Sequence, residues 1–80
     1  MRIDKYLKNA RIIKRRTIAK EACEQGRIMV NGRVAKPGVE IKIGDTIHIQ
    51  FGNKELNIRV TEVTESPRKE DATDMYEVIE

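Results

Sequence analysis

The sequence predicts an α+β fold in which two short N-terminal helices pack on a small, twisted and mainly antiparallel sheet. Three observations predict it. Up to residue 25, apolar residues recur at intervals of three and four, which is typical of helices with one buried face. Between residues 39 and 60 they alternate with polar residues, as in half-buried strands. An Asn-Gly pair at residues 31–32 interrupts an apolar run, which is a strong signal for a tight hairpin.

The two helices follow from their apolar stripes. The first is expected from Ile3 to Ala10, with Asp4 in its first turn suited to the positive end of the helix dipole. The second is expected from about Lys14 to Gln25, and Gly26 stands where a left-handed helix cap belongs. Its predicted buried face consists of Ile18, Ala19, Ala22 and Cys23.

The sheet is expected to begin with the hairpin of residues 28–36. Residues 39–43 and 46–51 are then predicted as strands on either side of a Gly44-Asp45 turn. Their buried faces would carry Val39, Ile41, Ile43, Ile47, Ile49 and Phe51. After a Gly52-Asn53 turn, residues 55–63 read as the antiparallel partner of 46–51.

Residues 1–63 are thus predicted to form the domain, and residues 64–80 an acidic C-terminal extension. Ala72, Met75, Tyr76 and Ile79 keep helical spacing, whereas residues 76–79 alone could be a strand. Of these alternatives, we expect a short helix.

Charge is strongly polarised along the chain. Residues 1–36 carry 11 basic and 3 acidic side chains, a net charge of +8, whereas residues 37–80 carry 5 basic and 10 acidic, a net charge of −5. Solvated lysines are common, but arginines cluster at positions 11, 15 and 16, and arginine presents a planar fork to phosphate oxygens. We therefore expect an RNA-binding ridge on the helix pair, made by Arg2, Lys5, Lys8, Arg11, Lys14, Arg15, Arg16 and Lys20.

Tyr6, Phe51 and Tyr76 are the aromatic residues, too few for a stacking platform for single strands. Recognition of structured RNA through its shape and phosphates fits the composition better.

No catalytic constellation is visible, and we expect a non-enzymatic protein without cofactor or metal. His48 is expected on the outer face of a strand with no nucleophile beside it, and Cys23 as a small buried hydrophobe. The glycines lack phosphate-loop spacing. With one cysteine, no apolar run of membrane-spanning length and no signal-peptide core, a cytoplasmic, non-membrane protein is expected.

The sequence contains several spaced motifs: RIDKYL at residues 2–7, Arg11, Arg16 and Ala19, the segment Gly26–Gly32, Lys36-Pro37 and Gly44-Asp45. Together, over about residues 1–51, they resemble the S-four RNA-binding domain. The resemblance implies two helices on a small sheet, RNA contacts at Arg2, Lys5, Arg11 and Arg16, and a turn shaped by Gly26, Asn31 and Gly32. One departure is Arg15, where many members have Ser or Thr, so a good helix N-cap is lost and a charge is gained.

The KRRTIAKE segment at residues 14–21 and the KEDATDMYEVI tail resemble the small ribosome-associated members of this family that act in ribosome quality control. That resemblance implies a stand-alone monomer that docks on rRNA and peptidyl-tRNA of the large ribosomal subunit. It also implies support of C-terminal alanine tailing of stalled chains together with an RqcH-like elongation factor. Two alternatives stay open: a general ribosome-assembly or RNA-chaperone factor of the same fold, and a protein adaptor that uses the basic ridge.

Overall fold

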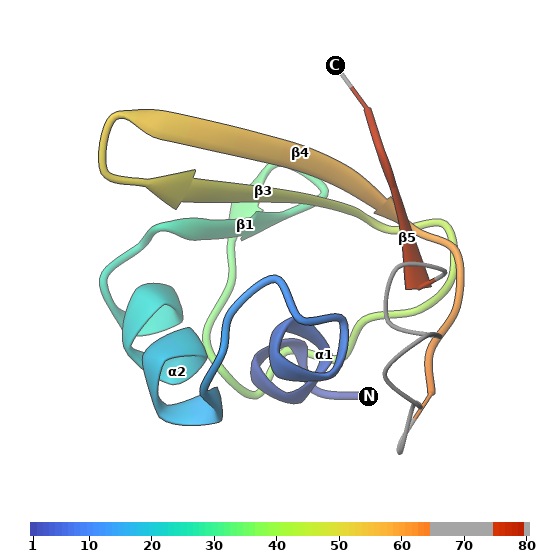
Figure 1. Ribbon diagram of the computed structural model, residues 1–80, viewed down its shortest axis with the longest axis horizontal. Coiled ribbons are helices and arrows are strands. Elements are labelled where there is room, and N and C mark those ends of the chain that lie inside the picture. Colours follow the sequence, from blue (N-terminus) through green and yellow to red (C-terminus); the bar gives the residue numbers. More distant parts are fainter. Residues whose placement is uncertain (65–74, 80) are drawn as a thin grey trace.

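The structure, a computed structural model, describes residues 1–64 and 75–79. Two helices, α1 (Ile3–Asn9) and α2 (Arg16–Glu24), form one layer beneath a five-stranded sheet (Figure 1). The strands are β1 (Ile28–Val30), β2 (Arg33–Val34), β3 (Thr46–Phe51), β4 (Lys54–Val60) and β5 (Tyr76–Val78). The predicted α+β architecture is confirmed.

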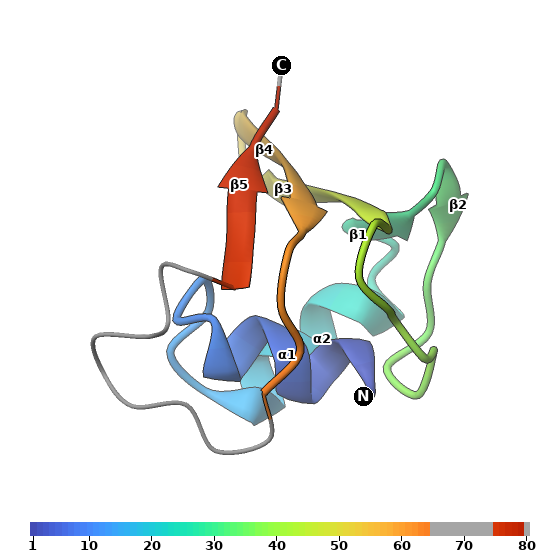
Figure 2. The ribbon, with the colours of Figure 1, turned by 90° about the vertical axis from the view of Figure 1, so that its right-hand side faces the viewer.

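The sheet is antiparallel throughout, in the order β2-β1-β3-β4-β5. Its centre is the β3–β4 hairpin, paired from Thr46↔Arg59 to Phe51↔Lys54 as the sequence predicts. The Asn31-Gly32 turn also forms, with φ of 51° and 82°, the positive values that a tight two-residue hairpin turn requires. Figure 2 shows β2 and β5 at the two opposite edges of the sheet.

Helix α2 ends as its sequence predicts. Gly26 has φ of 75°, and its N–H donates to the carbonyl of Cys23 while the N–H of Arg27 donates to that of Ala22. These two bonds define a Schellman cap. The helix begins less well, because Arg15 occupies the N-cap position and its side chain makes no capping hydrogen bond.

The core lies between the two layers. The predicted α1 stripe is fully confirmed, since Ile3, Tyr6, Leu7 and Ala10 are all buried. It meets the inward faces of the central strands, to which Ile28, Ile47, Ile49, Ile58 and Val60 contribute. These side chains alternate with outward-facing residues along each strand, so one face of the sheet is buried against the helices.

The predicted strand over residues 39–43 is wrong. The N–H of Ile41 donates to the carbonyl of Met1, and the N–H of Ile3 donates to the carbonyl of Val39, so this segment pairs briefly with the N-terminus instead of joining the sheet. It then turns, because the carboxylate of Asp45 accepts the N–H of Lys42 at 2.9 Å. The turn places Ile43, expected to be buried, 57% exposed. The predicted turn at Gly44-Asp45 is confirmed.

The helix expected near the C-terminus is also wrong in its described part, because Tyr76–Val78 forms the strand β5. Residues 65–74, where the rest of that helix was expected, lie outside the described residues. The buried Met75 precedes β5, and its carbonyl accepts hydrogen bonds from the Tyr6 hydroxyl at 2.5 Å and from the N–H of Thr61 at 2.9 Å. Backbone pairing with β4 therefore outweighs the helical spacing of the side chains.

Candidate nucleic-acid interface

The helix layer holds two of the predicted RNA-binding arginines on one buried carboxylate. Oδ2 of Asp4 lies 3.3 Å from Nη2 of Arg2 and 3.5 Å from Nε of Arg16. Oδ1 of the same carboxylate accepts the N–H of Lys5 at 2.8 Å. The Asp4 side chain is 2% exposed, whereas both arginine side chains are 48% exposed.

This arrangement orients the two arginines and leaves part of their hydrogen-bond donors for another partner. A guanidinium has five N–H donors, and the contacts with Asp4 are made by Nη2 of Arg2 and Nε of Arg16. The remaining donors of two neighbouring forks are left at a half-exposed surface, which is the geometry that carboxylates and phosphates bind in a bidentate manner. A shallow hollow there is lined by Arg2, Asp4, Arg16, Thr17 and Lys20.

A second group of predicted cations belongs to the connection between the helices. Arg11, the second residue after α1, has φ of 59°, a conformation that few residues other than glycine adopt. Lys14 and Arg15 follow, both exposed, and line a separate hollow between the helices and the sheet.

Seven of the eight predicted residues are exposed, and Lys5 is half-buried. The structure brings Arg2, Arg16 and Lys20 together around Asp4, and Lys14 and Arg15 together at the second hollow. Lys5, Lys8 and Arg11 line neither of these two hollows. Among the described residues, no acidic side chain forms an ion pair with Lys8, Arg11, Lys14, Arg15 or Lys20.

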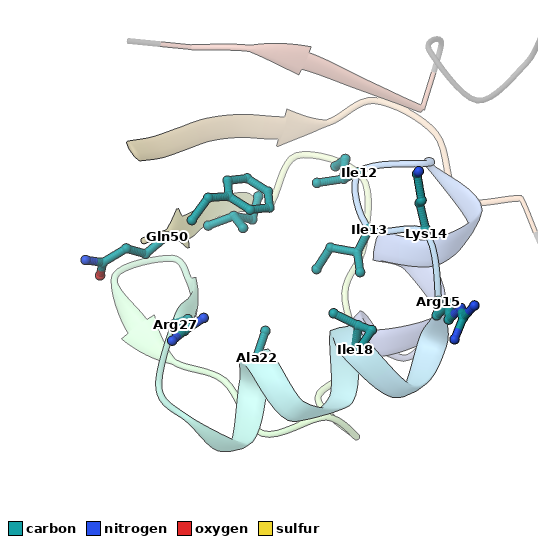
Figure 3. A pocket seen from close by; sticks show the side chains of 10 residues that line it. Ile12, Ile13, Lys14, Arg15, Ile18, Ala22, Arg27 and Gln50 are labelled. Carbon is teal, nitrogen blue, oxygen red and sulfur yellow. The ribbon is translucent and has the colours of Figure 1, made fainter. Parts of the chain in front are cut away.

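Sequence reasoning missed four residues at these hollows. Asp4 was assigned only to the helix dipole, and no local pattern shows that its carboxylate meets Arg16 twelve positions later. Arg27 lines the second hollow on the side opposite Lys14 and Arg15 (Figure 3). Ile18 and Phe51 were expected in the core but are 48% and 41% exposed at the same hollow.

Other chemically versatile groups have structural surroundings. Burial, with smaller contributions from Asp4 and Glu24, raises the pKa of the Cys23 thiol to about 11, and burial also raises the pKa of Tyr6. His48 lies on the outer sheet face as predicted, with Nδ1 2.7 Å from Oδ1 of Asn57 and Nε2 3.4 Å from Oε2 of Glu55.

In the part of the chain that the structure describes, no group of three or more His, Cys, Asp or Glu side chains is placed to hold a metal ion. Neither described helix is long and apolar enough to cross a membrane.

Comparison with known proteins defines the class. The S4 domain family matches residues 1–47, more than half of the chain. Together with the two helices packed on an antiparallel sheet, this match shows that the chain belongs to the S4 domain family.

Two relatives within this family match nearly the whole chain. The chain is 58% identical to the RQC P-site tRNA stabilizing factor of Halalkalibacterium halodurans, covering 98% of this chain and 89% of that protein. It is 46% identical to the protein of the same name from Bacillus subtilis, covering 99% and 92%. The expected resemblance to ribosome quality-control members of the family is thereby confirmed.

Among solved structures, the trimeric Heat Shock Protein 15 of Vibrio cholerae superposes with a TM-score of 0.92 at 31% identity, covering 99% of this chain and 81% of that one. The likeness therefore extends beyond the matched S4 segment to β4 and β5.

Proposed function

We propose that the protein is a non-enzymatic RNA-binding factor that docks its basic helix pair on the large ribosomal subunit and stabilises P-site peptidyl-tRNA during ribosome-associated quality control. The single observation that carries the RNA-binding part is the pair of half-exposed arginines, Arg2 and Arg16, held on the buried Asp4. The names of the relatives support the ribosomal part.

The electrostatics of the helix layer support a polyanionic partner. The eight basic residues of the ridge belong to one continuous stretch, residues 2–20, which contains a single acidic residue, Asp4. That carboxylate is buried, so it orients the arginines more than it repels an approaching phosphate. A guanidinium fixed before binding loses less conformational freedom when it meets a phosphate.

The proposal includes a place in the quality-control reaction. By holding peptidyl-tRNA in position, the protein would support C-terminal alanine tailing of stalled chains, with an RqcH-like elongation factor delivering the next residue. It would act as a monomer in the cytoplasm and would contribute no catalytic group.

The second candidate function is the alternative that the sequence leaves open, a general ribosome-assembly or RNA-chaperone factor of the same fold. Sedimentation with purified large subunits distinguishes the two candidates. Subunits carrying peptidyl-tRNA should retain the protein more tightly than empty subunits if it acts on stalled chains, and equally if it does not. Nuclease treatment that left the association intact would instead favour a protein adaptor.

Arg16→Ala tests the interface itself. Losing a charge-assisted contact of about 1.5–3 kcal/mol should weaken binding to large subunits about tenfold or more. Arg59→Ala is the matched control, because Arg59 also pairs with a carboxylate, Glu77, but lies on the sheet face away from the helices. Equal binding by the two variants, with unchanged melting, would exclude the helix layer as the contact surface.

The salt dependence of binding to large subunits gives the number of phosphate contacts. The logarithm of the affinity should fall linearly with the logarithm of salt concentration, with a slope of roughly −0.7 to −0.9 per contact. Arg16→Ala should reduce the slope by about one contact, and Arg59→Ala should leave it unchanged. A salt-independent affinity would contradict phosphate binding outright.

A further inference from the structure

An open apolar groove lies between α2, the connection before it and the end of the β3–β4 hairpin. It has a volume of about 490 Å³. Its apolar lining is made by Ile12, Ile13, Ile18, Ala22, Ile49 and Phe51. Figure 3 shows Ile12, Ile13, Ile18 and Ala22 directed toward one common space. Because Ile18 and Phe51 are 48% and 41% exposed, the groove presents an apolar patch of the kind that marks binding sites.

The polar residues of this groove indicate an anionic partner. Lys14 and Arg15 lie on one side of the space and Arg27 and Gln50 on the other (Figure 3). No acidic side chain is among the ten residues that line the groove. A ligand centred there would therefore have cations on both sides of it.

The groove and the proposed RNA surface meet at the start of α2, although they lie on opposite sides of that helix. Lys14 and Arg15 line it, and Arg16, the next residue, is paired with Asp4 in the neighbouring hollow. RNA that crosses the start of α2 would therefore meet Arg16 on one side of the helix and the groove on the other.

We propose that the groove binds one unpaired nucleobase of the RNA that the helix pair contacts through its phosphates. A base has two apolar faces and a polar edge. The Phe51 ring and the isoleucine side chains match the faces, and the Gln50 amide offers a donor and an acceptor to the edge. The phosphates on either side of that nucleotide would meet Lys14 and Arg15 in one direction and Arg27 in the other.

This inference rests on the proposed function, because it requires an RNA partner. It adds a preference that phosphate contacts cannot supply: RNA with a single unpaired nucleotide should bind better than a continuous duplex. An acidic amphipathic peptide would share the charge but not this preference, so the two occupants are separable.

The test compares two RNA hairpins that are identical except for one bulged nucleotide in the stem, with 2-aminopurine as the bulged base. The protein should bind the bulged hairpin about tenfold more tightly than the paired one, since stacking one base on an aromatic ring has about that effect. The 2-aminopurine fluorescence should change on binding. Phe51→Ala should abolish the preference and the fluorescence change without altering affinity for the paired hairpin, whereas Phe51→Tyr should retain both.

Val34→Ala is the matched control, because Val34 is an apolar strand residue that is 61% exposed and lines a different hollow. It should leave the preference intact. Thermal melting of each variant establishes that it is folded.

Each other outcome contradicts a definite statement. Equal affinity of the unmodified protein for the two hairpins overturns the base-binding groove while leaving phosphate binding intact. Equal weakening of both hairpins by Phe51→Ala also overturns it. Failure to bind either hairpin contradicts the proposed RNA-binding function, and the groove proposal with it.

Discussion

Asp4 is the residue on which the geometry of the cationic surface depends. Its burial would be unfavourable for an isolated carboxylate, and the two arginines and the N–H of Lys5 compensate for the lost water. The same contacts hold Arg2 and Arg16 side by side. The contacts that compensate for the burial of Asp4 therefore also set the positions of the two arginines that we propose to bind RNA.

Cys23 is predicted to have a structural role only. It is 2% exposed in the core, so Cys23→Ser should lower the free energy of unfolding by roughly 1–3 kcal/mol through burial of a hydroxyl, as measured by chemical denaturation. RNA binding by the folded variant should be unchanged. Rapid alkylation of the native protein at neutral pH, with loss of binding, would contradict this role.

The raised pKa of the Cys23 thiol predicts how the stability of the fold changes with pH. Its pKa rises from 9.0 to about 11 on folding, so the native state keeps the proton to a higher pH than the unfolded state does. The stability that this group contributes is therefore fully present below about pH 9 and is lost as the pH rises toward 11.

At the scale of elements, helix α2 is well capped at its C-terminus and poorly capped at its N-terminus. The Schellman cap at Gly26 satisfies two carbonyls, whereas the N-cap residue Arg15 leaves the first N–H groups without a side-chain acceptor. The backbone of Arg15 is extended, with φ of −128° and ψ of 139°, which is the conformation that a capping serine adopts. The chain has a cation at this position in place of a cap.

Arg15→Ser should therefore move stability and binding in opposite directions. A new cap should raise the free energy of unfolding by about 0.5–1 kcal/mol, while the loss of a cation should weaken RNA binding. Arg15→Ala is the control, since it removes the charge without supplying an acceptor. Equal unfolding free energies for the two variants would show that the serine does not cap α2.

For the whole molecule, the last strand closes the fold onto the first helix. The Tyr6 hydroxyl donates to the carbonyl of Met75, and β5 pairs with β4. The boundary expected at residue 63 therefore cuts through one sheet, and we propose that residues 1–64 and 75–79 fold as one unit.

Tyr6→Phe tests how much the hydrogen bond between the Tyr6 hydroxyl and the Met75 carbonyl stabilises the fold. It should lower the free energy of unfolding by about 0.5–1.5 kcal/mol, a modest amount because the Met75 carbonyl keeps the N–H of Thr61. Tyr76→Phe is the control, since the structure records no hydrogen bond of the Tyr76 hydroxyl with any described residue. Equal denaturation midpoints for the two variants would mean that the Tyr6 hydrogen bond contributes nothing.

Near-neighbour patterns were enough to predict both helices, the turn at Asn31-Gly32 and the β3–β4 pairing. Each depends on residues only a few positions apart, because periodicity, caps and tight turns are local properties. The concentration of positive charge on the helix pair is likewise a property of composition along the chain.

Tertiary structure alone decided the rest, because it depends on segments distant in sequence. Residues 39–43 pair with the N-terminus, and Tyr76–Val78 becomes a strand because the edge of β4 is open to it. Ile18 and Phe51 leave the core because α2 and the hairpin end diverge into a groove. The joining of Arg2 and Arg16 on Asp4 required two helices to pack, and no periodicity within either helix encodes that meeting.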